Sequence, residues 1–181
     1  MNSNARAGFT RVSDVRPQPP QGAPATGAPA TGAPGADDAQ SGVTDTAASK
    51  LIEVAAGLVF HRGRLLLAQR RTGDHLGGLW EFPGGKREAG ETFPDCLRRE
   101  LREELGVEVE VGERVESIRH DYPERRVHLE FFRCTLRAGE PRALGCQALV
   151  WVTQEELGAY AFPAADARLL DRLRREPLWW R

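Results

Sequence analysis

The 181-residue sequence lacks any long apolar run. It has no 18 consecutive apolar residues, which a membrane-spanning helix requires, and its first residues lack the apolar core of a secretory signal. It also lacks an excess of either charge, because 25 basic residues oppose 26 acidic ones, so no overall field attracts nucleic acid or an anionic membrane. We therefore expect a cytoplasmic protein that requires neither nucleic acid nor a membrane, and whose attraction for phosphate is local.

Cysteine is scarce as well. The three residues, Cys96, Cys134 and Cys146, form an odd-numbered set without a Cys-x-x-Cys pair. This pattern argues against a disulfide framework and against a zinc site. We therefore expect buried or incidental thiols.

Composition divides the chain near residue 50. Proline, glycine, alanine and small polar residues dominate residues 16–42, which include a repeated Gly-Ala-Pro-Ala-Thr. Such a segment cannot bury enough apolar surface to offset its ordering entropy. We expect residues 1–50 to form a disordered leader and residues 51–181 to form a single α+β domain that carries the function.

Regular patterning begins at Leu51. Two apolar segments, 51–60 and 64–69, flank His61-Arg62-Gly63 and predict two strands joined by a short turn. Residues 70–80 are typical of a loop, and the adjacent Trp179 and Trp180 are expected to pack back onto the domain. The other predicted elements are strands over 107–111, 114–121, 127–136 and 148–152 and a C-terminal helix over 163–175, which together predict a mixed sheet with flanking helices.

A central helix is marked by signals at both ends. Thr92 is a favourable N-cap, Pro94 lies in the first turn, and Asp95 completes the spacing of a capping box. Gly106 is the residue at which the helix is predicted to end. On a helical wheel, an apolar stripe formed by Leu97, Leu101 and Leu105 predicts the side that packs on the protein.

Three glutamates, Glu100, Glu103 and Glu104, cluster on one side of this helix. Like charges four residues apart destabilise a helix by about 0.2–0.5 kcal/mol, and a bound cation would reverse that sign. A solvated acidic patch balanced by neighbouring arginines is the ordinary alternative. The loop Gly84-Gly85-Lys86 and a fourth carboxylate, Glu91, precede the helix and favour instead Mg²⁺ bound to phosphate, because Mg²⁺ takes hard oxygen ligands.

The spacing of these residues resembles the Nudix box at every defined position. Gly85 is followed after five residues by Glu91, and after seven more by Arg99-Glu100-Leu101-Arg102-Glu103-Glu104-Leu105-Gly106-Val107. The flanking segments 70–71, 80–86 and 162–166 resemble the antimutator branch, whose members are similar to 8-oxo-dGTP diphosphatase. The resemblance implies an α+β fold, the Nudix α/β/α sandwich with a central mixed β-sheet flanked by helices.

The resemblance also implies roles for individual residues. The implied catalytic residues are Glu100, Glu103 and Arg99, with Arg99 orienting the glutamates and Glu91 supporting them from outside the metal site. The implied ligands of Mg²⁺, with Mn²⁺ as an alternative, are Gly84, Glu100, Glu103 and Glu104. The implied substrate-binding residues are Arg71, Phe82, Lys86, Arg125 and Asp166. For Arg71 and Arg125 ordinary surface charge is the alternative, and for Phe82 a place in the core.

Two departures from the antimutator pattern matter. The base-reading position is usually asparagine, whereas this chain has Asp166, and an ionised aspartate cannot donate a hydrogen bond. A loop glutamate that lies near the metals in similar enzymes would align near Gly145, where no carboxylate exists. We therefore expect Glu100 to act as the general base.

The resulting hypothesis is Mg²⁺-dependent hydrolysis of a nucleoside triphosphate, either 8-oxo-dGTP or a related NTP or dNTP, to the monophosphate and pyrophosphate. Such an activity would sanitise the nucleotide pool. The alternatives are a pyrophosphatase for CTP, dCTP, ADP-ribose or a sugar nucleotide, and a non-catalytic nucleotide-sensing module. The expected partner is a nucleotide. For the oligomeric state, the sequence is compatible with both a monomer and a homodimer.

Overall fold

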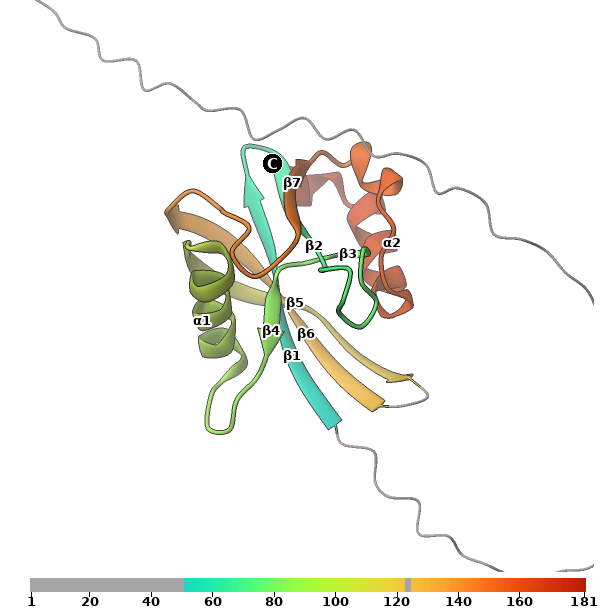
Figure 1. Cartoon of the computed structure of the whole chain (residues 1–181). Coiled ribbons are helices and arrows are strands. Elements are labelled where there is room, and N and C mark those ends of the chain that lie inside the picture. Colours follow the sequence, from blue (N-terminus) through green and yellow to red (C-terminus); the bar gives the residue numbers. More distant parts are fainter. Residues whose placement is uncertain (1–50, 123–124) are drawn as a thin grey trace, which may run out of the picture. The chain divides into compact units, whose positions relative to one another are not determined.

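The computed structural model describes residues 51–122 and 125–181, which belong to one compact unit. The leader expected over residues 1–50 lies outside the described residues. Within the described part of the chain, a seven-stranded sheet forms the centre of the fold (Figure 1). Its strands are β1 (Leu51–His61), β2 (Arg64–Gln69), β3 (Trp80–Glu81), β4 (Gly84–Lys86), β5 (Glu108–Tyr122), β6 (Arg125–Ala138) and β7 (Ala148–Val152).

The sheet is mixed because its central pair is parallel. The strand order is β3-β2-β1-β6-β5, with β4 paired to β1 and β7 paired to β2. Strands β1 and β6 run parallel over ten residue pairs, from Leu51↔Arg126 to Phe60↔Thr135. The pairs β1–β2, β1–β4, β2–β3, β2–β7 and β5–β6 are antiparallel.

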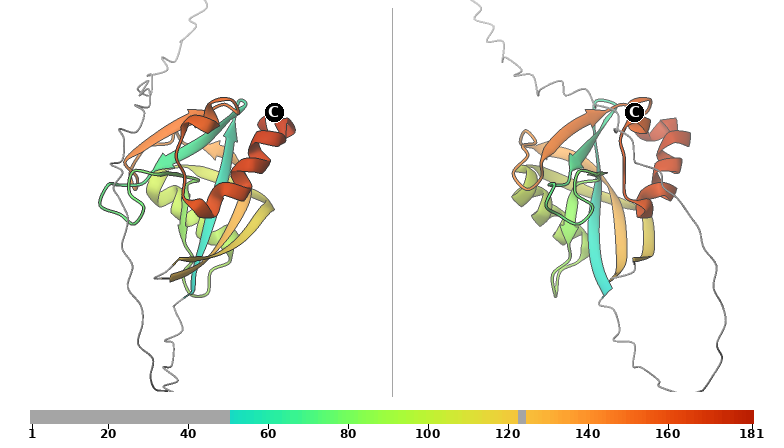
Figure 2. Two further views of the ribbon diagram at one scale, coloured as in Figure 1. Left: turned by 90° about the vertical axis from the view of Figure 1, so that its right-hand side faces the viewer. Right: turned by 45° about the vertical axis from the view of Figure 1, so that its right-hand side comes forward.

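Helices cover both faces of the sheet. Helix α1 (Phe93–Leu105) lies on one face and helix α2 (Ala167–Arg175) on the other, as Figures 1 and 2 show from different sides. This arrangement confirms the expected α/β/α sandwich. Short 3-10 turns, η1 (Glu156–Ala159), η2 (Ala164–Asp166) and η3 (Pro177–Trp180), complete the C-terminal region. Among the described residues, no helix is long and apolar enough to cross a membrane.

Strand β1 is buried on both faces, which explains its nearly continuous apolar sequence. Ala55 and Val59 belong to the core beneath α1, and Ala56 and Leu58 belong to the core beneath α2. Successive side chains of a strand point to opposite faces, so β1 anchors both layers at once. The three cysteines are free and buried, as predicted.

Four sequence-based assignments were wrong. The strands predicted over 107–111 and 114–121 form one strand, β5, because irregularities in its pairing with β6 near Arg114 interrupt the alternation without ending the strand. The loop predicted over 70–80 ends before Trp80, and Gly84-Gly85-Lys86 is strand rather than loop. The C-terminal helix predicted from residue 163 begins with the turn η2 and becomes α-helical only at Ala167.

The two C-terminal tryptophans pack back on the domain, as predicted. Trp180 is 8% exposed, its ring meets Phe60 edge-on at 5.5 Å, and its Nε1 donates to the Leu173 carbonyl at 2.9 Å. Arg133 donates to the Trp179 carbonyl at 3.0 Å. The chain following α2 is thereby held against β1 and β6.

Replacing Trp180 by alanine should lower the free energy of unfolding by about 3 kcal/mol, because it removes a buried ring and leaves a cavity. Leu178 is 68% exposed, so Leu178→Ala is the matched control and should cost about 0.5 kcal/mol or less. Urea denaturation of both variants measures the difference. Equal losses in the two variants would contradict the packing described.

Candidate active site

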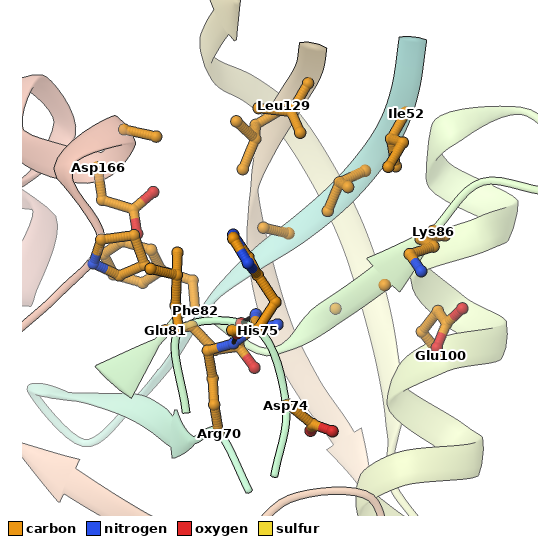
Figure 3. Close-up of a pocket in the computed structure, with 18 of the residues that line it drawn as sticks. Ile52, Arg70, Asp74, His75, Glu81, Phe82, Lys86, Glu100, Leu129 and Asp166 are labelled. Carbon is orange, nitrogen blue, oxygen red and sulfur yellow. Dashed lines mark hydrogen bonds and ion pairs between the residues drawn. The ribbon is translucent and has the colours of Figure 1, made fainter. Parts of the chain in front are cut away.

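A cavity of about 410 Å³ opens beside β1 and β6. Its apolar wall includes Val54, Val127, Leu129 and Phe131. Its polar lining comes from α1, the loop after β2, strands β3, β4, β5 and β6, and the turn η2. Figure 3 shows Asp166 at one end of this cavity and Glu100 with Lys86 at the other. The cavity therefore joins the acidic helix to the C-terminal region.

The ends of α1 are fixed as the sequence predicts. The Thr92 hydroxyl accepts from the Asp95 backbone N–H at 3.2 Å and donates to the Asp95 carboxylate at 2.6 Å. Gly106 ends the helix with φ of 69°, a left-handed conformation that favours glycine, and its N–H donates to the Arg102 carbonyl. Leu97, Leu101 and Leu105 are fully buried. The rotation of α1, and with it the direction of the glutamates, is therefore set.

Arg99 connects the acidic residues to one another. Its Nε and Nη2 donate to the two carboxylate oxygens of Glu91 at 2.6 and 2.9 Å. Its Nη1 donates to Glu100 Oε1 at 2.8 Å and to Glu103 Oε2 at 3.3 Å. The hydrogen bonds from Arg99 lower the pKa of Glu91 to about 2, so Glu91 stays ionised. Glu91 thus orients Arg99, which holds Glu100 in turn.

Strand β4 brings its backbone against the carboxyl group of Glu100. A Cβ atom built on Gly85 would lie 2.2 Å from Glu100 Cδ, and one on Gly84 would lie 2.0 Å from the Ala55 carbonyl oxygen. Only glycine fits at Gly84, where the neighbouring atoms are backbone, whereas a side chain at Gly85 would have to displace the Glu100 carboxyl group. The Glu100 side chain, 13% exposed, is therefore confined between β4 and Arg99.

The Glu104 side chain is more buried than that of Glu103. Burial, reinforced by the negative charges of Glu100 and Glu81, raises the pKa of Glu104 to about 7. Glu104 and Glu100 both line the cavity. The Glu103 side chain is 60% exposed, and Glu103, Arg99 and Glu91 do not line the cavity.

The carboxylates suit a hard divalent cation. In residues 51–122 and 125–181, no three acidic, histidine or cysteine side chains converge into a complete metal site. The repulsion between Glu100 and Glu104 is nevertheless the kind of interaction that a cation reverses, and carboxylate and backbone oxygens are the ligands that Mg²⁺ prefers. Because Mg²⁺ usually keeps waters and takes substrate phosphate oxygens as well, a partial protein site fits it.

The other end of the cavity is aromatic and contains a buried acid. Phe82 is 4% exposed and contacts Phe131 and Phe162 at ring distances of 5.8 and 5.3 Å. It therefore belongs to the core and also lines the cavity. Asp166 is 4% exposed and lines the cavity beside Pro163.

Three predicted cationic residues also line the cavity, namely Arg71, Lys86 and Arg125. Arg71 is exposed, and its Nη2 donates to the Leu144 carbonyl at 2.8 Å. Lys86 is an exposed residue of β4, and Arg125 begins β6. The structure therefore brings positive charge and the helix carboxylates to the same opening.

Comparison with known proteins gives consistent matches. A family model described as a NUDIX domain matches residues 55–172. The CTP pyrophosphohydrolase of Escherichia coli strain K12 is 43% identical over 122 residues, covering 67% of this chain and 90% of that relative. The 8-oxo-dGTP diphosphatase of Haemophilus influenzae is 39% identical over 128 residues, covering 70% and 94%. The solved structure of the E. coli ORF135 protein is 42% identical, with a TM-score of 0.59 and coverage of 68% and 88%.

The chain belongs to the Nudix family. The match spans more than half of the chain and includes β4 and all of α1, which carry the Nudix box. Further relatives named 8-oxo-dGTP diphosphatase, at 32% to 41% identity, support the antimutator branch expected from the sequence. The chain is accordingly a Nudix hydrolase.

The loop around Gly145 packs against the C-terminal end of α1. The backbone N–H groups of Leu144 and Gly145 both donate to the Glu104 carbonyl at 3.0 Å, so this loop closes the C-terminal end of α1. A Cβ atom on Gly145 would lie 2.6 Å from Glu104 Cγ. A side chain at position 145 would therefore overlap Glu104 as the two are packed here.

Sequence reasoning assigned no role to Arg70 and Glu81. Arg70 Nη1 donates a hydrogen bond to Glu81 Oε2, and Arg70 Nε donates one to the His75 carbonyl at 2.8 Å. All three residues line the cavity of the Nudix site. The one available signal was a glutamate between Trp80 and Phe82, because a charged residue flanked by two aromatic ones needs a partner when it is buried.

Replacing Gly85 by alanine should displace the Glu100 carboxylate from β4 and weaken Mn²⁺ binding by about 10–100-fold. Electron paramagnetic resonance titration of Mn²⁺ measures the affinity. Gly73→Ala is the control, because a Cβ atom there meets nothing within 4 Å and should leave the affinity unchanged. Unchanged Mn²⁺ affinity in Gly85→Ala would show that the carboxylate is not held at a metal site.

Proposed function

We propose that this chain hydrolyses a nucleoside triphosphate to the monophosphate and pyrophosphate. The observation that carries the proposal is the cavity with Glu100 and Glu104 at one end and Asp166 with Phe82 at the other (Figure 3). A triphosphate is polyanionic and needs cations, whereas a base needs an apolar slot with a few hydrogen-bonding groups. The end with Glu100 and Glu104 therefore suits the triphosphate with its cations, and the end with Phe82 and Asp166 suits the base.

The metal of this proposal is Mg²⁺, with Mn²⁺ as a substitute. Its ligands would be the Gly84 carbonyl, Glu100, Glu103 and Glu104. When bound, the ion would neutralise phosphate charge and lower the pKa of a water molecule. Glu103 joins this set only if its exposed side chain turns from Arg99 toward the cavity.

The residues of the chain would orient the reactants and accept the proton. Glu100 Oε1 already accepts from Arg99 Nη1, so Oε2 is the oxygen that would collect the proton of the attacking water. Lys86, Arg71 and Arg125 line the cavity and would hold the phosphates, including the pyrophosphate that departs. No covalent intermediate with the chain is needed.

The base would be held at the opposite end, between Phe82 and the apolar wall, within reach of Asp166. Relatives named for CTP and relatives named for 8-oxo-dGTP are both present at similar identity. The test therefore includes CTP and 8-oxo-dGTP as substrate classes, with ADP-ribose as a third. We also propose that the domain comprises residues 51–181, and that the enzyme acts on the nucleotide pool of the cytoplasm without nucleic acid.

The test is a hydrolysis screen with Mg²⁺ against 8-oxo-dGTP, the ordinary dNTPs and NTPs, and ADP-ribose, with products resolved by chromatography. We expect conversion of a triphosphate to its monophosphate. Glu100→Gln and Glu104→Gln should each lower kcat by about 10²-fold or more, since each removes a charge from the metal site.

Glu108→Gln is the matched control, because Glu108 is an exposed residue of β5 that does not line the cavity. It should turn over at the wild-type rate. Tight nucleotide binding without turnover in the wild-type protein would contradict the enzyme and support a sensing module.

A further inference from the structure

The loop between β4 and α1 is fastened by one side chain, Arg87. This loop connects Lys86 to Thr92 (Figure 1) and carries Glu91, whose carboxylate orients Arg99. Arg87 Nη1 donates to the backbone carbonyl of Glu91 at 2.7 Å. The backbone of Glu91, and not only its carboxylate, is therefore held by a hydrogen bond.

The other side of the Arg87 guanidinium is bound to the sheet. Its Nε donates to Glu53 Oε2 at 3.0 Å, and its Nη2 donates to the same oxygen. The backbone N–H of Arg87 donates to the Glu53 carbonyl at 2.9 Å. The guanidinium also lies 5.2 Å from the ring centre of Phe93, the first residue of α1. Arg87 therefore bridges β1, the end of the loop and the start of α1.

Glu53 is anchored in the two central strands. His128 of β6 is its partner in the parallel pairing, and His128 Nδ1 lies 3.8 Å from Glu53 Oε1. The His128 ring also meets Phe93 edge-on at 5.6 Å. His128 Nε2 lies 3.0 Å from Oε1 of Glu130, whose side chain is buried. The bridge that Arg87 forms thus ends in the middle of the sheet.

In the other direction the contacts continue from Glu91 into the site. Glu91 Oε2 accepts from the backbone N–H of Glu88 at 3.0 Å, and both carboxylate oxygens accept from Arg99. Arg99 Nη1 donates to Glu100 Oε1 at 2.8 Å. Arg87 does not line the cavity, so it reaches Glu100 only through Glu91 and Arg99.

The bridge requires the geometry of arginine. A guanidinium presents its N–H groups in a rigid plane, so Nε and Nη2 serve Glu53 while Nη1 serves Glu91. Lysine has the same charge but a single nitrogen on a flexible chain, and methionine has neither charge nor donor. Substitution by lysine and by methionine therefore separates the charge of Arg87 from its bridging.

We propose that Arg87 is a positioning residue of the Nudix site, which fixes Glu91 against β1 and thereby holds Arg99 on Glu100. The inference rests on the proposed function, because a cation bound at Glu100 is part of that proposal. Holding a ligand side chain in place before the ion arrives reduces the entropy lost on binding. Loss of Arg87 should therefore loosen Arg99 and weaken cation binding, although Arg87 contacts neither Arg99 nor the ion.

The first measurement is the ¹H–¹⁵N resonance of the Arg99 Nε–H group in the full chain, without metal or nucleotide. Its assignment comes from its loss in Arg99→Lys. Because this group donates to Glu91 Oε1 at 2.6 Å, the resonance reports directly on their pairing. Arg87→Met and Arg87→Lys should both shift or broaden it. Arg87→Lys keeps the charge beside Glu53, so its urea midpoint should stay close to that of the wild-type chain.

The second measurement is Mn²⁺ affinity by electron paramagnetic resonance titration. Arg87→Met should weaken binding by about 5–10-fold, at or below the lower limit for a residue that bonds a metal ligand directly. In a Glu91→Ala background the same substitution should change the affinity by less than about twofold, because its path to Glu100 is already broken.

Arg98→Met is the matched control. It removes the same charge from α1, and Arg98 pairs with Asp95 at 2.8 Å and does not line the cavity. Both readouts should match those of the wild-type chain. An unchanged Arg99 resonance in Arg87→Met overturns the inference, and so does an affinity loss that Arg98→Met reproduces or that persists in full with Glu91→Ala. Neither readout uses a nucleotide, so a chain that hydrolyses no nucleotide would contradict the proposed function alone.

Discussion

Helix α1 approaches strand β4 so closely that a single methyl group at Gly85 would overlap the carboxyl group of Glu100. This contact depends on three other features. The leucine stripe sets the rotation of α1, β1 holds β4 by backbone pairing, and Arg99 restrains the carboxylate from its other side. Because β1 also carries the core beneath α2, the same strand fixes the acidic helix and the wall of the cavity.

The acidic helix at one end of the cavity could be predicted because the residues that determine it are close together in the sequence. The Thr92 cap, the leucine spacing and the Gly106 stop all act within one helix, and the structure places them as expected. Strands β3 and β4 were not predictable, because two or three residues show no periodicity and become strand only by pairing with β2 and β1. The continuity of β5 was hidden for a related reason, since its irregular pairing breaks the alternation of side chains.

The end of the cavity formed by Phe82 and Asp166 could be predicted only through resemblance. Asp166 and Phe82 are far apart in the sequence, and Phe131 comes from a third segment, so no spacing rule relates them. The bond between Arg70 and Glu81 is likewise a product of the folded loop. The family could therefore be read from one contiguous motif, whereas the burial that raises the pKa of Asp166 arises from tertiary packing.

The parallel pairing of β1 with β6 has a consequence for how the domain is made. Leu51 pairs with Arg126, about 75 residues later in the chain. On the ribosome, β1 therefore emerges well before its parallel partner β6. Pairing across such a separation is slow, because the entropy of closing the loop is lost before the contacts form. Until β6 is made, one edge of the apolar strand β1 has no partner, and an unpaired strand edge promotes aggregation of the kind that chaperones prevent.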